Sequence, residues 1–578
     1  MKLKTILLAA LVLAASCTKK PADGLHHLVV ISTGDVHGSY FDQPYVDGKH
    51  TRTSLMSVKK FVDMARESEG EDNVLLIDAG DILQGDNAAY YYNYVATDQP
   101  HIFPLLADYI GYDVCVLGNH DIETGHGVYD RVARELKSKG IQWLAGNAVK
   151  PNGKSYFPMY TIVEKAGMRI AVLGFDNANI KSWLSEELWD GMRFESLVPF
   201  VQGCVDKVIK KEKPDMVIVA AHSGTGEGDG TQLENQGLDL YNSLKGVDLV
   251  IGAHDHRPYK ISDGEKAYVD GGARAGNIGL VIFEPCFENG EKVMSSVFVC
   301  DFVKLDKADV DTVMREHFRP QFEAVKEFTL RKVGSLAMPL RTRDAYTGMC
   351  DYLNLIHTVQ LSAKEATISL AAPLTFNGEV KAGELIYNDM FTIYPFENQL
   401  FVVRMTGKEI KDFLEYSYDN WIMTPGEHLL RIHPYKDERT SSAAWSFYAR
   451  PYNFDSAAGI NYEVDVTEPC GSRVKISSLS DGKAFDMDAS YNVAMTSYRA
   501  NGGGKTMPEG AGIDAAELDS RVVARYPEIR EMIYEYIKSV PEVTPESVGD
   551  RGVIGEWKFV PEEVAAPLLE DDMKLVFP

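Results

Sequence analysis

The sequence lacks the cysteine patterns that build structural zinc sites or disulfide frameworks. Its 578 residues include only seven cysteines, which are widely scattered and form no CxxC pair. A cysteine-based metal motif and a dense set of disulfides are therefore excluded. Cys286 and Cys300 flank the turn-like stretch ENGE, which leaves open one disulfide across a hairpin. Cys115 lies in a predicted strand, and we expect it to be inert core.

An excess of positive charge is also absent. The chain has 59 Lys and Arg against 84 Asp and Glu, a formal net charge of -25. Proteins that hold polymeric nucleic acid on a basic surface need clustered Lys and Arg to displace counterions. The composition argues against that class, and an anionic substrate would need a local, strongly positive group to attract it.

Long apolar runs are missing except at the N-terminus. Two lysines there precede TILLAALVLAAS, a run too short to span a membrane as a permanent helix, which predicts a signal peptide over 1–16. The AAS before Cys17 resembles a bacterial lipobox, although Ala14 stands where Leu is commoner. We expect lipid attachment at Cys17 and a lipidated tether over 17–27, with ordinary signal cleavage as the alternative. Either way the mature protein is expected to be exported, to the periplasm or, as a lipoprotein, to the outer membrane or cell surface.

The length suggests two or more domains, and 45% hydrophobic with 25% charged residues is typical of a folded chain. The first half alternates short apolar strands with helical stretches, which predicts an α/β layered domain. The second half reads as another α/β domain, in which Thr406 and Glu409 predict a capping box before a helix. Between them, the apolar residues of 306–332 recur at helical spacing, and Pro320 should divide this connector.

Five predicted strands of the first half end in polar side chains. The strand ends read GDVHG, GDILQGD, GNHDIE, AHSG and GAHDH, and they carry Asp35, His37, Asp81, Asn119, His120, His222, His254 and His256. One such histidine would be an ordinary loop residue, but five ends in order, at the edge where α/β sheets place ligand sites, predict a shared site. Carboxylates and imidazoles without thiolates suit Mn, Zn, Fe or Mg. Eight groups exceed the needs of one ion, so two divalent ions sharing a carboxylate is the economical interpretation.

These five blocks resemble those of the calcineurin-like metallophosphoesterases, in the branch that contains secreted bacterial nucleotidases. The resemblance implies a four-layer α/β/β/α metallophosphoesterase domain over 28–305 and a nucleotidase-type substrate-binding domain over 336–545. A connecting helical segment over 306–335 would join them, and a tail would follow over 546–578. The implied ligands of the first metal are Asp35, His37 and His256, those of the second are Asn119, His222 and His254, and the bridging ligand is Asp81.

The same resemblance implies that His120 stabilises the transition state or protonates the leaving oxygen, helped by a carboxylate three residues later. That carboxylate is Glu123, where related 5'-nucleotidases usually carry Asp. A longer acid can still orient an imidazole and raise its pKa. Asp121 is interpreted either as a structural acid or as a solvated turn residue, and His126 as structural. Hydroxide activated by the metals would attack phosphorus in line, without a phosphoenzyme.

The C-terminal half carries candidate substrate loops. The stretch GGGKT ends like a P-loop, but Arg499 stands where that motif needs glycine, so ATP binding of this type is rejected and a ligand loop is favoured. YPFEN and SYRANGGG resemble the two substrate blocks of the family, whose aromatic rings sandwich a base. By this resemblance Phe396 and Tyr498 form the sandwich, Asn398 contacts the base and Gly459 offers a backbone contact. The alternative is that both rings are core aromatics.

Several sequence blocks of the C-terminal half also resemble one subfamily of these enzymes more than another. AAPL, IYPFENQL, YNFDSAAGINYEVDVTEP and YRANGGG resemble the 2',3'-cyclic-nucleotide 2'-phosphodiesterase/3'-nucleotidase group more than the 5'-nucleotidases, which usually have an Arg-bearing GGIR block and an Asp where Gly504 stands. The preferred function is a two-metal hydrolase of nucleoside monophosphates and 2',3'-cyclic nucleotides. A 5'-nucleotidase, a related sulfur-compound hydrolase and a binding lipoprotein with an inactive site remain as alternatives.

Overall fold

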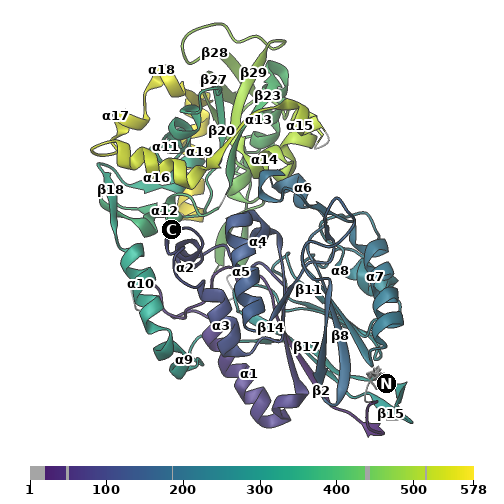
Figure 1. The fold of residues 1–578 in the computed structure, drawn as a ribbon. Helices are drawn as coiled ribbons and strands as arrows, with labels where there is room; N and C mark the ends of the chain where they lie inside the picture. The colour runs from purple at the N-terminus through teal and green to yellow at the C-terminus, as the bar shows by residue number, and fades with distance from the viewer. Residues whose placement is uncertain (1–19, 47–50, 185, 397, 437–442, 515–516) are drawn as a thin grey trace, which may run out of the picture.

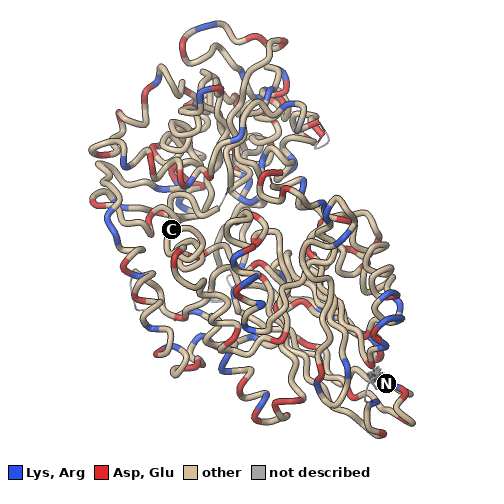
Figure 2. Tube along the Cα trace, viewed as in Figure 1, with Lys and Arg blue, Asp and Glu red and all other residues tan. Residues whose placement is uncertain are grey.

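The computed structural model describes residues 20–46, 51–184, 186–396, 398–436, 443–514 and 517–578 (Figure 1). The predicted signal peptide and Cys17 lie outside these residues. In Figure 1 the described chain forms two lobes, the N-terminal half below and the C-terminal half above. Within the described ranges, no helix is both long enough and apolar enough to cross a membrane. Lys and Arg are interspersed with Asp and Glu along both lobes (Figure 2).

Two six-stranded sheets build the N-terminal lobe. The first has the order β17 (Val297–Lys304), β14 (Asn277–Phe283), β2 (Leu28–Thr33), β3 (Val74–Asp78), β4 (Val114–Val116), β5 (Gln142–Leu144). The second has the order β12 (Tyr259–Ser262), β13 (Ala267–Asp270), β11 (Leu249–Gly252), β10 (Met216–Ala221), β8 (Met168–Phe175), β7 (Tyr160–Lys165). Strands β2 to β5 run parallel to one another, as do β8, β10, β11 and β13.

The sheets face each other, and helices cover both outer faces. Along β3, Leu75 and Ile77 pack between the sheets, while Val74 and Leu76 pack under helices. The first sheet is covered by α1 (Leu55–Glu69), α3 (Ile102–Ile110) and α5 (His126–Ser138), and the second by α7 (Leu197–Glu212) and α8 (Gly237–Ser243). Burial on both faces explains why these strands are continuous apolar runs. The predicted α/β/β/α layering is confirmed.

The connector is two helices, α9 (Thr312–His317) and α10 (Arg319–Thr329), separated at Phe318. Pro320 lies in the first turn of α10, where its missing N–H costs nothing, so it begins a helix and divides the segment as predicted. Phe322 and Val325 of α10 pack into the N-terminal core, whereas Phe328 packs into the C-terminal one. The connector is therefore held by both lobes.

A five-stranded sheet lies at the centre of the C-terminal lobe. Its order is β26 (Ser456–Ala458), β20 (Ile368–Ala371), β29 (Ser490–Thr496), β23 (Gln399–Thr406), β30 (Val522–Glu528). Helices α11 (Asp351–Leu361) and α16 (Ile529–Ser539) cover one face, and α13 (Gly407–Trp421) covers the other. The capping box predicted at Thr406 and Glu409 is present at the start of α13.

Residues 546–578 do not form a tail. β31 (Trp557–Val560) pairs in parallel with β27 (Ile460–Asp465), and α19 (Glu562–Val576) packs Leu569 and Val576 into the core of the C-terminal lobe. The apolar side chains of this segment thus complete the domain, and the boundary expected at residue 545 is corrected.

Cys286 and Cys300 do not form the disulfide that the sequence left open. The six described cysteines are all free thiols. The ENGE stretch does turn between β15 (Cys286–Glu288) and β16 (Glu291–Met294), but Cys300 belongs to β17, opposite Val281 in another sheet. Cys115 is buried core as expected, and burial raises the pKa of its thiol well above the usual value.

Candidate active site

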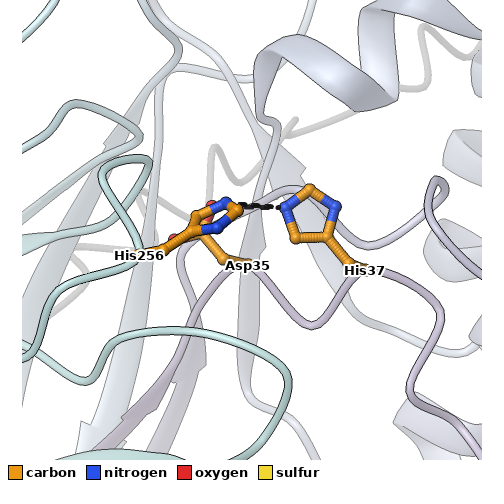
Figure 3. A group of neighbouring side chains, drawn as sticks. All are labelled: Asp35, His37 and His256. Atoms are coloured by element: carbon orange, nitrogen blue, oxygen red, sulfur yellow. Dashed lines mark hydrogen bonds and ion pairs between the residues drawn. The ribbon is translucent and has the colours of Figure 1, made fainter. Parts of the chain in front are cut away.

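The polar strand ends of the N-terminal lobe meet at one place. Parallel strands end at the same edge of a sheet, and the two sheets bring these edges together. The converging ligand atoms form two groups, Asp35 with His37 and His256 and Asp81 with His222 and His254, each within 4.8 Å of one another. Figure 3 shows the first group, in which the imidazoles of His37 and His256 face each other beside Asp35.

Asp81 belongs to the second group and also approaches the first. Its Oδ2 is 3.0 Å from His222 Nε2 in one group and 4.0 Å from His37 Nε2 in the other. Burial alone would raise its pKa, but the neighbouring His222 and His120 hold the pKa of Asp81 well below the usual range. Asn119 adjoins the second group, since its Oδ1 is 2.9 Å from His254 Nδ1. The Asp81 carboxylate is therefore placed where it could ligate a cation in either group.

The donor set fits a pair of divalent cations. Asp35 Oδ1 is buried and has no hydrogen-bond partner among the described residues. An unpaired buried polar group costs about 1–3 kcal/mol, which a cation would offset. Burial lowers the pKa of His37 well below normal and that of His256 to about 4, so both imidazoles keep a lone pair. Their Nε2 atoms lie 2.9 Å apart, and oxygen and imidazole ligands suit Mn, Zn, Fe or Mg.

The backbone is unusual at these positions. Of the seven predicted metal ligands, five have left-handed backbones with φ between +46° and +92°, namely Asp35, His37, Asp81, His254 and His256. A non-glycine residue held in this region costs about 1–3 kcal/mol and persists where the surroundings over-determine it, as in active sites. The strain is an indication of function that no sequence pattern gave.

Asp121 holds these loops in place. It is fully buried, and its carboxylate accepts N–H groups at 2.9–3.0 Å from Gly118, Asp81, Ile82 and Leu83. Burial raises its pKa to about 6, which these backbone bonds oppose. The interpretation as a structural acid is confirmed, and the alternative of a solvated turn residue is wrong. His126 is also structural, with ring nitrogens near Asp130 and the carbonyl of Asp190.

His120 and Glu123 lie one turn apart on the short helix α4 (Asn119–Glu123). Glu123 Oε2 is 2.5 Å from His120 Nδ1, so the carboxylate orients the ring although it is one methylene longer than Asp. The His120 side chain is 34% exposed and that of Glu123 is 15% exposed. Burial raises the pKa of Glu123, and the charge of His120 opposes this. The His120 ring is 5.4 Å from that of His37 and is thus at the edge of the metal-ligand groups.

Three further side chains support the ligand histidines and were not singled out from the sequence. Gln84 Oε1 is 3.0 Å from His37 Nδ1, Glu234 Oε1 is 2.9 Å from His254 Nε2, and the Trp183 ring stacks on His254 at 5.2 Å. Such outer partners fix the orientation of a metal-binding imidazole. Gln84 belongs to the block GDILQGD and could have been found by spacing, whereas Trp183 and Glu234 carry no sequence signal.

The predicted substrate side chains lie in the C-terminal lobe. Phe396 is 38% exposed and Tyr498 is 42% exposed, so neither is the core aromatic of the alternative interpretation. Asn398 is half-buried just before β23. In Figure 1, α6 (Ile180–Trp183) lies beneath α14 (Ser497–Ala500), and Asn501 Nδ2 donates to the Trp183 carbonyl at 3.2 Å. The loop after Tyr498 thus contacts the residue that stacks on His254.

Gly459 does not have the role expected for it. It is buried, its N–H donates to the Ile554 carbonyl, and its own carbonyl accepts from Ser480. Its φ is +88°, and a Cβ there would lie 2.3 Å from the Thr367 carbonyl oxygen. The turn itself requires glycine, so the expected contact between Gly459 and the base is corrected to a structural role.

Each lobe matches a known protein family. Residues 28–258 match the calcineurin-like phosphoesterase family, and residues 332–509 match the 5'-nucleotidase C-terminal domain. The 2',3'-cyclic-nucleotide 2'-phosphodiesterase/3'-nucleotidase of Haemophilus influenzae is 25% identical over 92% of this chain and 87% of its own length. The 5'-nucleotidase of Vibrio cholerae is 24% identical over 87% of this chain and 90% of its own.

The trifunctional nucleotide phosphoesterase protein YfkN of Bacillus subtilis is 23% identical over 90% of this chain, which spans only 38% of YfkN. Among solved structures, a putative 5'-nucleotidase from Staphylococcus aureus shares the fold with a TM-score of 0.72 and 18% identity, over 92% of this chain and 99% of that one. Together with the two groups of ligand side chains, these matches show that the chain belongs to the calcineurin-like phosphoesterases that carry a 5'-nucleotidase C-terminal domain, and that it is a phosphoester hydrolase.

Proposed function

We propose that this enzyme hydrolyses nucleotide phosphoesters, specifically 2',3'-cyclic nucleotides and 3'-nucleotides. One observation carries the proposal. Tyr498, one of the two exposed rings predicted to hold the base, lies just before Asn501, whose side chain contacts the N-terminal lobe at Trp183, beside His254. A base stacked on Phe396 or Tyr498 would thus place its sugar phosphate toward the two ligand groups. Stacking of this kind contributes about 1–3 kcal/mol per base.

In this proposal, seven residues bind the metal ions and His120 acts on the substrate. Asp35, His37 and His256 would hold one divalent cation, Asn119, His222 and His254 a second, and Asp81 both. Bound cations would supply the positive charge that this acidic chain lacks and would lower the pKa of the attacking water. His120 lies beside the ligands with Nδ1 held by Glu123, so its other nitrogen is oriented to donate a proton to the leaving oxygen or to stabilise charge on phosphate.

The environment of Gly504 supports the cyclic-nucleotide and 3'-nucleotidase assignment over the 5'-nucleotidase alternative. Its φ is +69°, and a Cβ there would lie 2.2 Å from Asn453 Oδ1 and 2.3 Å from Arg499 Nη1. The Asp that 5'-nucleotidases usually carry at this position would therefore require the ends of the Asn453 and Arg499 side chains to move. Relatives named for both activities match the chain at similar identity, so the choice rests on the C-terminal sequence blocks and on the glycine at position 504.

The test compares 3'-AMP, 5'-AMP and 2',3'-cyclic AMP as substrates of the full chain, with Mn, Zn or Mg supplied. We expect release of phosphate from 3'-AMP and ring opening of the cyclic nucleotide, with slower turnover of 5'-AMP. A preference for 5'-AMP would establish the 5'-nucleotidase alternative. No turnover of any of the three with any metal would sink the proposed function.

Tyr498→Ala tests the base-binding role. We expect the KM for 3'-AMP to rise about tenfold, because about 1–3 kcal/mol of stacking is lost. The KM for p-nitrophenyl phosphate should rise less, since this substrate lacks a base. Tyr435→Ala is a matched control, because Tyr435 is 42% exposed in the same lobe and has no proposed role. Equal losses on both substrates would contradict the stacking role.

We further propose that the chain is exported and anchored by lipid at Cys17. The support is the N-terminal sequence, together with the position of the described N-terminus at the end of the molecule away from the C-terminal lobe (Figure 1). Anchoring there leaves the region between the lobes accessible. Cys17→Ser should move the protein from the membrane fraction to the supernatant of fractionated cells, and its retention with membranes would contradict lipid attachment.

A further inference from the structure

The stretches YNFD (Tyr452–Asp455) and YRANGGG (Tyr498–Gly504) are far apart in the sequence but form one unit in the structure. We propose that Tyr452 is a third aromatic wall of the base-binding slot, fixed in place by Arg499. This inference rests on the proposed function, since it adds a wall to the slot whose other walls are Phe396 and Tyr498. It gives a role to a motif that the metal site and the two stacking rings leave unexplained.

Ring geometry places Tyr452 between the other two rings. Its centroid is 6.3 Å from that of Phe396 with an interplanar angle of 83°, and 6.3 Å from that of Tyr498 with an angle of 87°. Both rings therefore stand nearly perpendicular to Tyr452, in the edge-to-face arrangement that aromatic pairs prefer. Within the part of the chain that the structure describes, no ring contact joins Phe396 to Tyr498. The three rings thus outline a slot with Tyr452 at its inner end.

The slot has a defined stacking face. A Cβ on Gly503 would lie 2.5–2.6 Å from three atoms of the Tyr498 ring, so the Gly503 backbone already lies against that ring. A base can stack only on the surface of Tyr498 that Gly503 leaves uncovered. At 42% and 38% exposure, Tyr498 and Phe396 retain surface for a flat ligand, while the half-buried Tyr452 closes the inner end.

Arg499 joins the segments that carry the walls. Its side chain is 3% exposed, its Nη2 lies 2.7 Å from Asp455 Oδ2, and its Nε donates to Asp455 Oδ1 at 3.2 Å. Nη2 also donates to the Tyr452 carbonyl at 2.6 Å, and Nη1 donates to the Gly503 carbonyl. A two-pronged guanidinium–carboxylate pair has a fixed geometry. It therefore fixes Tyr452 relative to Tyr498 before any ligand arrives, which reduces the ordering cost of binding.

A planar heteroaromatic base is the ligand that such a slot recognises. Its face meets Tyr498 or Phe396, and its edge, where ring hydrogens carry partial positive charge, meets the Tyr452 ring. A simple aryl phosphate has no base and carries its ring directly on the phosphate, without the sugar that separates base from phosphate in a nucleotide. Tyr452 therefore contributes to the binding of nucleotides more than to that of aryl phosphates.

The test measures KM for 3'-AMP and for p-nitrophenyl phosphate with the metal-loaded full chain. Tyr452→Leu should raise the KM for 3'-AMP by about five- to tenfold, the size expected for loss of an aromatic edge contact, and should raise the KM for p-nitrophenyl phosphate less. Tyr452→Phe keeps the ring and should stay within about twofold of the wild type. Tyr448→Leu is the matched control, because Tyr448 is 66% exposed four residues upstream and has no part in the slot.

Tyr498→Ala, measured alongside, separates failure of this inference from failure of the proposed function. If Tyr498→Ala raises the KM for 3'-AMP and Tyr452→Leu does not, the third wall is overturned and the base slot stands. If neither variant discriminates between the two substrates, the base-binding function itself fails. Should Tyr452→Leu not fold, Tyr452→Met, which fills similar space without a ring, should show the same selective rise, and its absence would overturn the proposal.

Discussion

Replacing Asp81 by alanine should reduce phosphoester hydrolysis by a factor of about a thousand or more and should remove both bound metal ions. The carboxylate belongs to the second ligand group and approaches the first, since it is 3.0 Å from His222 Nε2 and 4.0 Å from His37 Nε2. Its other oxygen accepts the backbone N–H of His120 at 2.8 Å. One substitution would thus remove the proposed shared ligand of the two cations and release the start of the helix that carries the proposed catalytic imidazole.

The measurement is metal content per chain after dialysis, together with kcat for 3'-AMP. Asp215→Ala is the matched control, because Asp215 is a half-buried acid at the opposite end of β10 from His222, where it accepts the N–H of Arg169. That variant should keep both ions. An Asp81→Ala protein that retained two ions, or a tenth of the activity, would contradict the bridging role.

The placement of the candidate metal ligands at the edge of each sheet was predictable from strand geometry. Asp35 follows β2 and Asp81 follows β3, and parallel strands place such residues at one edge of a sheet. His222 and His254 follow β10 and β11 of the other sheet. That the two edges meet depends on how the sheets pack, which the motifs of the family implied and periodicity alone could not.

Residues supplied by the segments that connect the strands were not predictable in the same way. Trp183 and Glu234 both contact His254, but each comes from a segment between strands whose path is set by tertiary packing. Gly459 was assigned the wrong role for a different reason. A glycine that is needed for a φ of +88° in a buried turn cannot be told, from sequence, from a glycine that lets a ligand approach the backbone. Residues 546–578 looked like a tail since the strand that β31 joins lies about a hundred residues earlier, at β27.

His120→Ala should lower kcat for 3'-AMP by about a hundredfold or more while both metal ions stay bound. The imidazole is outside the two groups of ligand atoms, and its ring is 5.4 Å from that of His37. Metal content separates this variant from Asp81→Ala. Comparing 3'-AMP with p-nitrophenyl phosphate also distinguishes the two possible roles of His120, proton donor or stabiliser of charge. The leaving group p-nitrophenolate needs no proton, so loss of a proton donor should not slow its release. A loss confined to 3'-AMP indicates proton donation, an equal loss on p-nitrophenyl phosphate indicates stabilisation of phosphate charge, and a loss under tenfold on both would exclude a catalytic role.

Glu123 orients the His120 imidazole. Its Oε2 is 2.5 Å from His120 Nδ1, so its carboxylate fixes which nitrogen faces the substrate. Glu123→Gln keeps the length and removes the charge, and it should lower kcat by less than His120→Ala does. Glu123→Asp keeps the charge and shortens the side chain by one methylene. If Asp is more active than Gln, charge matters more than reach; if Gln is more active, the longer side chain is the feature that this catalytic pair requires.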